Sequence, residues 1–288
     1  MNFRLSYSLV AITFHSFLYV SAQESIEKQE VVSNHFLEIG LGLNCHGVRD
    51  LGTSPLTYKG YLPQIHLQYL FLNKRYSGIL EENFSIGYLK TRNYPDPDDN
   101  RAVSYNNELA FDLLYSLKSS QKTSFYMGGQ LGTLVDIRSN EKYNNANLNY
   151  EILATLSPTV LFEYRTSLKK GDLVSESLNQ RKRDRDFKFQ YILTVPVLTG
   201  ILRPGYVTIS DFVDDSGLVL TKDNITLSSF DHLVCFKNRF NFYYILHNNN
   251  MLKLNYNLSY FSYYGNYNPV RGFSSSFMVS VVFRFSNN

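Results

Sequence analysis

The stretch Phe273–Asn288, FSSSFMVSVVFRFSNN, decides the fold of this chain. Its residues alternate between a more polar face, which carries Ser274, Ser280 and Arg284, and a mainly apolar face. The apolar face consists of Phe273, Ser275, Phe277, Val279, Val281, Phe283 and Phe285. A period of two is that of a β-strand, whose successive side chains point to opposite faces. The sequence therefore predicts a long final strand with aromatic residues running to its last turn.

The same alternation recurs along the chain and is clearest in 105–118, where Leu113 faces one way and Asp112 the other. Tyr105 and Tyr115 on the apolar face lie ten residues apart. In a strand tilted as in a barrel this separation corresponds to a height of roughly 25 Å, which is the height of the apolar band in barrels that span a membrane. Short turns are expected at Asn73, Ser119 and Asn248. Ten strands are expected, at about 36–45, 61–72, 76–91, 105–118, 124–138, 148–165, 187–201, 230–247, 251–264 and 273–288.

Strands of this kind, with a closing strand that ends in aromatic residues, resemble those of bacterial outer-membrane β-barrels. The resemblance implies an all-β fold, a closed antiparallel transmembrane β-barrel of about ten strands with both termini in the periplasm. It implies as partners outer-membrane lipid, the barrel-insertion machinery and periplasmic chaperones. It also implies an assembly signal at Phe277, Val279, Val281, Phe283 and Phe285. The chain departs from the family pattern because the last aromatic is followed by Ser286, Asn287 and Asn288.

Three features leave room for other arrangements. The charged segment 166–186 falls where a short turn is expected, so a missed hairpin would raise the count to twelve strands. The alternation slips at Glu81–Glu82, which indicates a bulge or a wrong register, and Pro196 predicts a weak or bulged point in 187–201. A water-soluble sandwich is the alternative fold; strand length, apolar outer faces and the N-terminal segment argue against it.

The N-terminal segment has the pattern of a secretory signal peptide. Arg4 supplies a positive charge, Leu9–Val20 is an apolar core, and Val20-Ser21-Ala22 is a small-residue cleavage site. The expected organisation is a signal peptide at 1–22, a polar periplasmic lead-in at 23–34 and the barrel at 35–288.

Composition narrows the possible classes further. The 288 residues suit a single barrel, and outside the N-terminal segment no apolar run reaches the ~18 residues of a spanning helix. The net charge of +3 is too near neutral to indicate nucleic-acid binding. Cys45 and Cys235 are assigned to opposite faces, so we expect two isolated thiols in place of a disulfide. No residue pattern points to a cofactor or a metal.

Charged side chains of both signs alternate onto the inner face of the expected barrel. A ten-stranded lumen is little wider than an eight-stranded one, which side chains fill. Opposite charges in that space would pair and plug the lumen, or they would line a narrow polar channel. The expected lumen charges are Glu38, Glu108, Asp112, Asp136, Glu151, Glu163, Arg138, Arg165, Lys188, Lys237, Arg239, Lys253 and Arg284.

The leading functional prediction is a non-enzymatic barrel of the Gram-negative outer membrane. It would act as a small porin-like channel or as a structural and interaction component of the cell envelope. The alternative is a protease-like surface hydrolase, in which Asp98-Asp99 and Asp231-His232 at the rim would activate water. Adjacent strand residues point to opposite faces, which argues against joint action of Asp231 and His232, so no catalytic residue is assigned.

Overall fold

The computed structural model shows the chain between Asn34 and Ser286 mostly as β-strand. The residues that it describes are 34–73, 75–91, 100–142, 148–168, 185–203, 213–214, 217–218, 225–264 and 269–286. The expected signal peptide at 1–22 and nearly all of the lead-in at 23–34 lie outside the described residues. Across the described ranges, no helix has the length and apolar character needed to span a bilayer.

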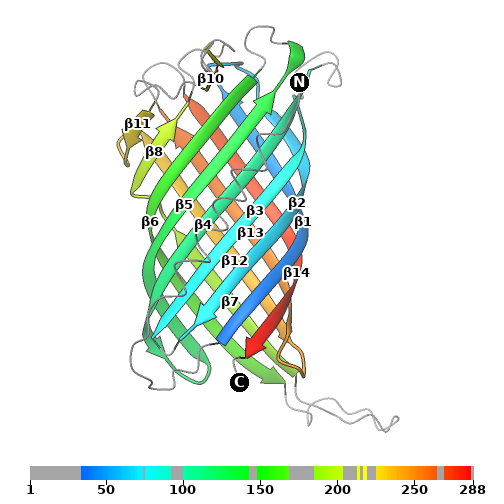
Figure 1. Cartoon of the computed structure of the whole chain (residues 1–288), viewed down its shortest axis with the longest axis vertical. Helices are drawn as coiled ribbons and strands as arrows, with labels where there is room; N and C mark the ends of the chain where they lie inside the picture. Colours follow the sequence, from blue (N-terminus) through cyan, green and yellow to red (C-terminus); the bar gives the residue numbers. More distant parts are fainter. Residues whose placement is uncertain are drawn as a thin grey trace, which may run out of the picture. The chain divides into compact units, whose positions relative to one another are not determined.

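Ten of the described strands form a closed antiparallel ring (Figure 1). The ring runs from β1 to β7, continues through β12, β13 and β14, and closes because β14 pairs with β1. The expected barrel of about ten strands is thus confirmed, and the twelve-stranded alternative is not. The strands are β1 (Asn34–Asp50), β2 (Tyr58–Leu72), β3 (Tyr76–Thr91), β4 (Arg101–Ser119), β5 (Thr123–Ser139), β6 (Leu148–Leu168), β7 (Arg185–Thr194), β8 (Leu198–Leu202), β9 (Val213–Asp214), β10 (Gly217–Leu218), β11 (Ile225–Ser228), β12 (Leu233–Ile245), β13 (Met251–Tyr263) and β14 (Val270–Ser286).

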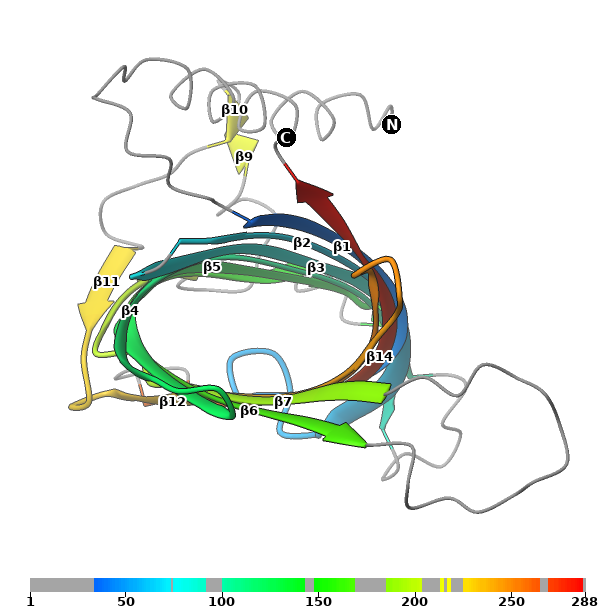
Figure 2. The same cartoon turned by 90° about the horizontal axis from the view of Figure 1, so that it is seen from below.

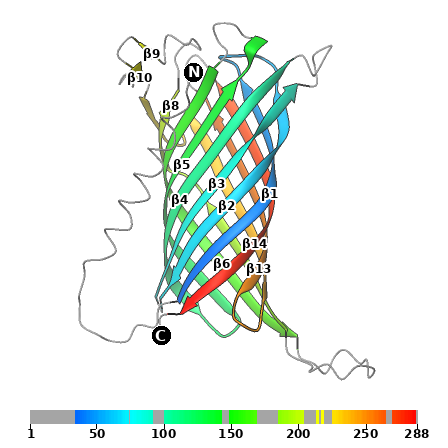
Figure 3. The same ribbon diagram turned by 45° about the vertical axis from the view of Figure 1, so that its right-hand side comes forward.

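The barrel is closed by its first and last strands. All 17 residues of β1 pair with β14, from Asn34 opposite Ser286 to Asp50 opposite Val270. Figure 3 shows the two strands side by side along this seam. The alternating C-terminal stretch therefore forms the closing strand, as the sequence predicts.

Alternation gives the barrel an apolar outer surface and a polar lumen. Leu41, Leu131 and Phe277 point outward and are 67%, 60% and 54% exposed, whereas Asp112 and Arg239 point inward and are 0% and 1% exposed. Figure 2, which looks along the barrel, shows the strands as a ring around this interior. A water-soluble barrel would have the opposite polarity, so this arrangement is that of a barrel that spans a lipid bilayer.

Strand β3 stays in register through Glu81 and Glu82. Glu81 lies opposite Gln68 and Ala110, and Glu82 lies opposite Leu67, without a shift in either ladder. Glu81 is buried in the lumen and Glu82 is on the outer face. The bulge suspected at this point is therefore absent, because the two acids simply occupy the two faces of a regular strand.

The pairing of the wall is interrupted next to Pro196, as predicted. β7 ends at Thr194, and β8 from Leu198 onward pairs with β6 on one side but with β11 in place of β12 on the other. Proline has no N–H to donate to a neighbouring strand. β12 pairs with β7 only from Lys237 onward, so among the described strands only β13 pairs with Leu233–Phe236. We call the place where β8 and β12 diverge the β8–β12 gap.

The two ends of the ring differ in their connections. At the end where β14 finishes, which we call the turn end, the N–H of Asn73 donates to Tyr76 and that of Ser120 to Thr123, each at 2.8 Å. In the third predicted turn Asn249 has φ of 62°, a left-handed conformation that asparagine tolerates. The opposite end, which we call the loop end, carries the connections 51–57, 92–100, 140–147 and 264–269 and the chain between β7 and β12. The connection between β6, which ends at Leu168, and β7, which begins at Arg185, lies at the turn end and is the exception to this pattern. Most of the charged segment 166–186 lies outside the described residues.

Candidate functional site

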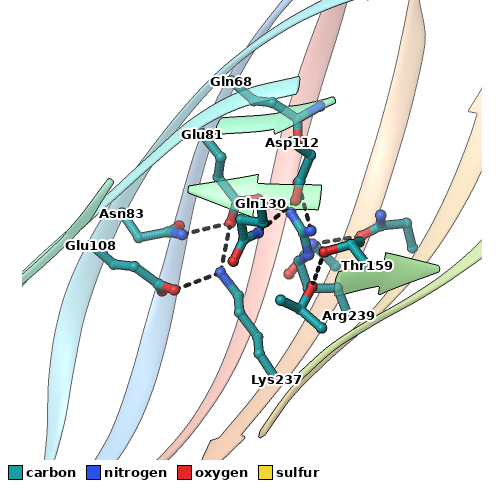
Figure 4. A network of polar contacts seen from close by, with 12 residues as sticks. Gln68, Glu81, Asn83, Glu108, Asp112, Gln130, Thr159, Lys237 and Arg239 are labelled. Carbon is teal, nitrogen blue, oxygen red and sulfur yellow. Dashed lines mark hydrogen bonds and ion pairs between the residues drawn. The ribbon is translucent and has the colours of Figure 1, made fainter. Parts of the chain in front are cut away.

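An arginine spans the lumen from one wall to the wall opposite. Arg239 on β12 pairs with Glu81 on β3 and lies 2.7 Å from the carboxylate of Asp112 on β4. In the ten-stranded ring β3 is five strands from β12 in either direction. Gln130 donates to Asp112 at 2.7 Å and Asn83 to Glu81 at 2.6 Å, so both carboxylates have further hydrogen bonds (Figure 4).

Lys237, also on β12, adds a second bridge at this level. Its ammonium lies 2.7 Å from Glu108 on β4 and 3.5 Å from Glu81. Figure 4 shows the lysine between the two acids, beside the arginine. Charges removed from water are stable only when paired and hydrogen-bonded, and these side chains meet that condition. We call this group the central network; it comprises Glu81, Glu108, Asp112, Lys237 and Arg239.

Towards the turn end a second group surrounds the ring of Tyr243. Lys253 lies 2.9 Å from Glu38, and Lys188 lies 3.6 Å from Glu163. Both ammonium groups lie over the Tyr243 ring, 5.5 Å and 4.1 Å from its centroid, a favourable contact of a cation with an aromatic face. This group therefore places paired charges and an aromatic ring in the lumen near the turn end.

Towards the loop end a third group is centred on Arg138 of β5. Its guanidinium lies 2.8 Å from Asp136, 2.6 Å from Glu151 and 3.1 Å from Asp50. Arg203, which follows β8, lies 2.8 Å from Asp50 and links β1 to the same group. The central network and the Arg138 group thus join strands on opposite sides of the lumen, whereas the Tyr243 group joins β6, β7, β12, β13 and β1, which lie close together in the ring.

Most of the lumen charges expected from the sequence lie in these three groups, but two arginines lie at the turn end. The side chain of Arg165 is 54% exposed, although it contacts Glu163 at 2.6 Å. Arg284 is exposed and donates to Asn34 at 2.6 Å. The residues proposed as an assembly signal (Phe277, Val279, Val281, Phe283 and Phe285) all point outward on β14 and are 36–54% exposed.

Within the described residues, three charges of the lumen were not among the expected ones. Glu81 was obscured by the suspected bulge, although strict alternation along 76–91 places it inward. Asp50 lies beyond the predicted end of the first strand, and continued alternation from Glu38 would have found it. Arg203 follows the break at Pro196, where alternation loses its phase, so no sequence signal identifies it.

Apolar side chains also enter the lumen. Leu153, Ile201 and Leu233 form a buried cluster near the loop end, with Cys235 packed against it. A cavity of about 90 Å³ lies where Cys235 and the central network meet the β8–β12 gap, and another of about 30 Å³ lies near Arg138. These volumes correspond to a few water molecules. Cys235 is a free thiol, as is Cys45, and no cluster of His, Cys, Asp and Glu within the described ranges could hold a metal ion.

The acid–histidine pair at the rim does meet in space. His232 Nδ1 lies 2.7 Å from Asp231 Oδ2, because both residues lie in a turn before β12, so the expectation that they point apart is wrong. The hydrogen bond with His232 lowers the pKa of Asp231. The Ser229 hydroxyl donates to the Val197 carbonyl at 2.7 Å and is not held by the histidine, while Asp98-Asp99 lies outside the described residues. The turn therefore presents an exposed Asp–His hydrogen bond, and among the described residues no nucleophile is bonded to the imidazole.

Comparisons with known proteins give similarities of architecture only. The chain matches no protein-family model and no curated protein sequence. It is similar to the outer membrane protease OmpT from Escherichia coli, with 10% identity over 91% of this chain and 99% of that chain and a TM-score of 0.46. It is similar to the translocator domain of the autotransporter NalP from Neisseria meningitidis, with 7% identity over 97% and 98% and a TM-score of 0.33. It is also similar to a Pseudomonas aeruginosa FadL homologue, with 10% identity over 88% and 90% and a TM-score of 0.28.

Proposed function

We propose that this chain is an integral barrel of a bacterial outer membrane whose lumen is closed by ion pairs. It acts as a structural or interaction component of the cell envelope, and not as a diffusion pore or a hydrolase. The observation that carries the proposal is the contact of Arg239 with Glu81 and Asp112, which lies across the lumen from wall to wall. An open pore would need both the arginine and its acids to be solvated separately, at the cost of these bonds.

The closed lumen predicts an absence of conductance. Purified protein refolded into planar lipid bilayers in KCl is expected to insert without unitary currents, whereas a known porin in the same bilayers conducts. Insertion is verified independently by protection of the barrel from protease in vesicles of the same lipid. Regular unitary currents from inserted protein would favour the porin-like channel and overturn the closed lumen.

The apolar outer surface supports the membrane location, and the unequal ends support an orientation. Outer-membrane barrels have short periplasmic turns and longer external loops. Three of the four connections at the turn end, those after β2, β4 and β12, are short, so we place the turn end and both ends of the barrel chain in the periplasm. The outward aromatic face of β14 supports recognition by the insertion machinery, with periplasmic chaperones delivering the chain and outer-membrane lipid surrounding it.

Cysteine labelling tests this orientation at the two ends of a single strand. Glu141 and Gln121 are exposed residues that flank β5 at the loop end and the turn end. In a chain with Cys45 and Cys235 replaced by alanine, Glu141→Cys is expected to react with a membrane-impermeant maleimide on whole cells, and Gln121→Cys only after the cells are opened. The reverse labelling pattern would invert the proposed topology.

A further inference from the structure

The outer surface of the barrel carries a carboxylate in the middle of its apolar band. Along β3 the outward residues run from Tyr76 at the turn end to Tyr88 at the loop end, and Glu82 lies midway between these tyrosines. Its neighbour Glu81 points into the central network, so Glu82 points away from the lumen. Tyrosines at both edges of the band mark the membrane interfaces, which places Glu82 at the depth of the acyl chains.

Glu82 has one hydrogen-bond partner on the same surface. The side-chain amide of Asn107 on β4 donates to its carboxylate at 3.2 Å. The amide has a second N–H, and the carboxylate has a second oxygen. Within the described part of the chain, no further bond is made by either group, so both the donor and the acceptor retain capacity towards the bilayer.

The bilayer cannot provide hydrogen-bond partners for the second N–H of Asn107 and the second oxygen of Glu82. Acyl chains offer no hydrogen-bond donor or acceptor, and an ionisable side chain at this depth is costly unless another protein group pairs with it. The central network explains why Glu81 is tolerated, since Arg239 and Lys237 neutralise it. Within the described barrel the groups recorded beside Glu82 are the Asn107 amide and the Tyr105 phenol, and no cation is paired with it. A second protein surface could supply the further donor that the chain itself does not.

We propose that Glu82 and Asn107 form a contact between two copies of this barrel within the membrane. The Asn107 amide of one copy donates to the Glu82 carboxylate of the other, and the reverse. A donor and an acceptor side by side make the surface self-complementary, which is what a two-fold interface requires. The proposal rests on the membrane-spanning part of the proposed function and is independent of whether the lumen is closed.

The surface beside the pair suits close approach of a second barrel. In register with Glu82 across the sheet follow Leu109 on β4, Thr133 on β5 and Ala154 on β6. Thr133 and Ala154 are exposed, and small residues let backbones in a membrane pack closely. Leu109, which is 37% exposed, supplies apolar contact next to the polar pair.

Cross-linking in native membranes tests the contact. In the full chain with Cys45→Ala and Cys235→Ala, Leu109→Cys is expected to give a species of twice the mass on oxidation in outer-membrane vesicles. The matched control is Leu254→Cys on β13, which is 41% exposed and lies five strands from β4 around the ring. Equal cross-linking at both positions, no cross-linking at Leu109→Cys, or a cross-link to another protein would each overturn the proposal.

The polar pair is tested separately in the Leu109→Cys chain. Glu82→Leu is expected to lower the cross-linked fraction at least tenfold while the barrel stays folded, as read from its heat-modifiable mobility on gels. Glu82→Gln retains an acceptor for Asn107 and is expected to retain the cross-link. An unchanged fraction in folded Glu82→Leu would reject the pair as the contact. Because neither variant touches the lumen, conductance recordings on the same proteins report on the proposed function independently.

Discussion

Replacing Arg239 by methionine is expected to lower the free energy of unfolding by about 3–5 kcal/mol, because it leaves buried charges without their partner. Glu81 and Asp112 would remain in the lumen at 1% and 0% exposure. Lys237 could neutralise only one of them, since it lies near Glu81. The measurement is urea unfolding in phospholipid vesicles followed by far-UV circular dichroism, since the chain has no tryptophan.

Two further variants isolate the cause. Arg165→Met removes an arginine from an ion pair whose arginine side chain is 54% exposed, and such exposed pairs contribute less than about 1 kcal/mol. Arg239→Met combined with Glu81→Gln and Asp112→Asn removes the uncompensated charges and is expected to recover most of the loss. If Arg239→Met were as stable as Arg165→Met, the wall-to-wall contact would not stabilise the barrel.

Leu131→Arg is expected to impair membrane assembly far more than Leu117→Arg. Both leucines point outward with similar exposure, 60% and 57%, but Leu131 lies near the middle of β5 and Leu117 near the turn end of β4. An arginine on the lipid face costs about 2–4 kcal/mol at the midplane and about 0–1 near the interfaces. The fraction inserted into vesicles, measured from folded-form mobility on gels, gives the difference.

The pair of leucines holds residue type and exposure nearly constant and changes depth; Leu117 also lies at the register shift between Ser116 and Lys118 in the β4–β5 ladder. Equal insertion of the two variants would contradict a lipid-facing surface. A chain that folds and stays soluble in the absence of lipid would contradict it more directly, since the water-soluble sandwich makes that prediction. Leu114→Arg would not serve as a lumen-facing control for these variants. Leu114 points into the lumen, but it is fully buried in an apolar cluster with Leu70 and Ile79, so an arginine there would also be destabilising.

The number of strands and the faces of most strand residues could be predicted because a period of two survives almost unbroken in this chain. Leu113 and Asp112 lie on the faces that the alternation assigned to them. The ends of the strands could not be placed as well: β1 was expected at 36–45 and extends over Asn34–Asp50. Pairing with β14 on one side holds it extended beyond the region where its own residues alternate clearly.

Which charges meet in the lumen could not be predicted from the sequence. Alternation places Arg239 and Asp112 inside, but their contact depends on strand tilt and on the relative stagger of strands on opposite walls. The apolar clusters around Leu114 and Leu153 were also unexpected. In a single strand, an inward leucine is only an exception to the polar inner face. The closed ring shows that such leucines from different strands lie at the same height of the lumen and pack together.

The β8–β12 gap divides the barrel into two mechanically different parts. From Lys237 opposite Thr194 to the turn end, every strand has two neighbours, so the circumference is fixed by the number of strands and their stagger. Above that point the wall is an open ribbon with one edge at Leu233–Phe236 and another at β11. That part can widen or narrow without breaking ladder hydrogen bonds. Among Val234–Phe236, the amide hydrogens that point away from β13 should accordingly be the first of β12 to exchange with solvent deuterium.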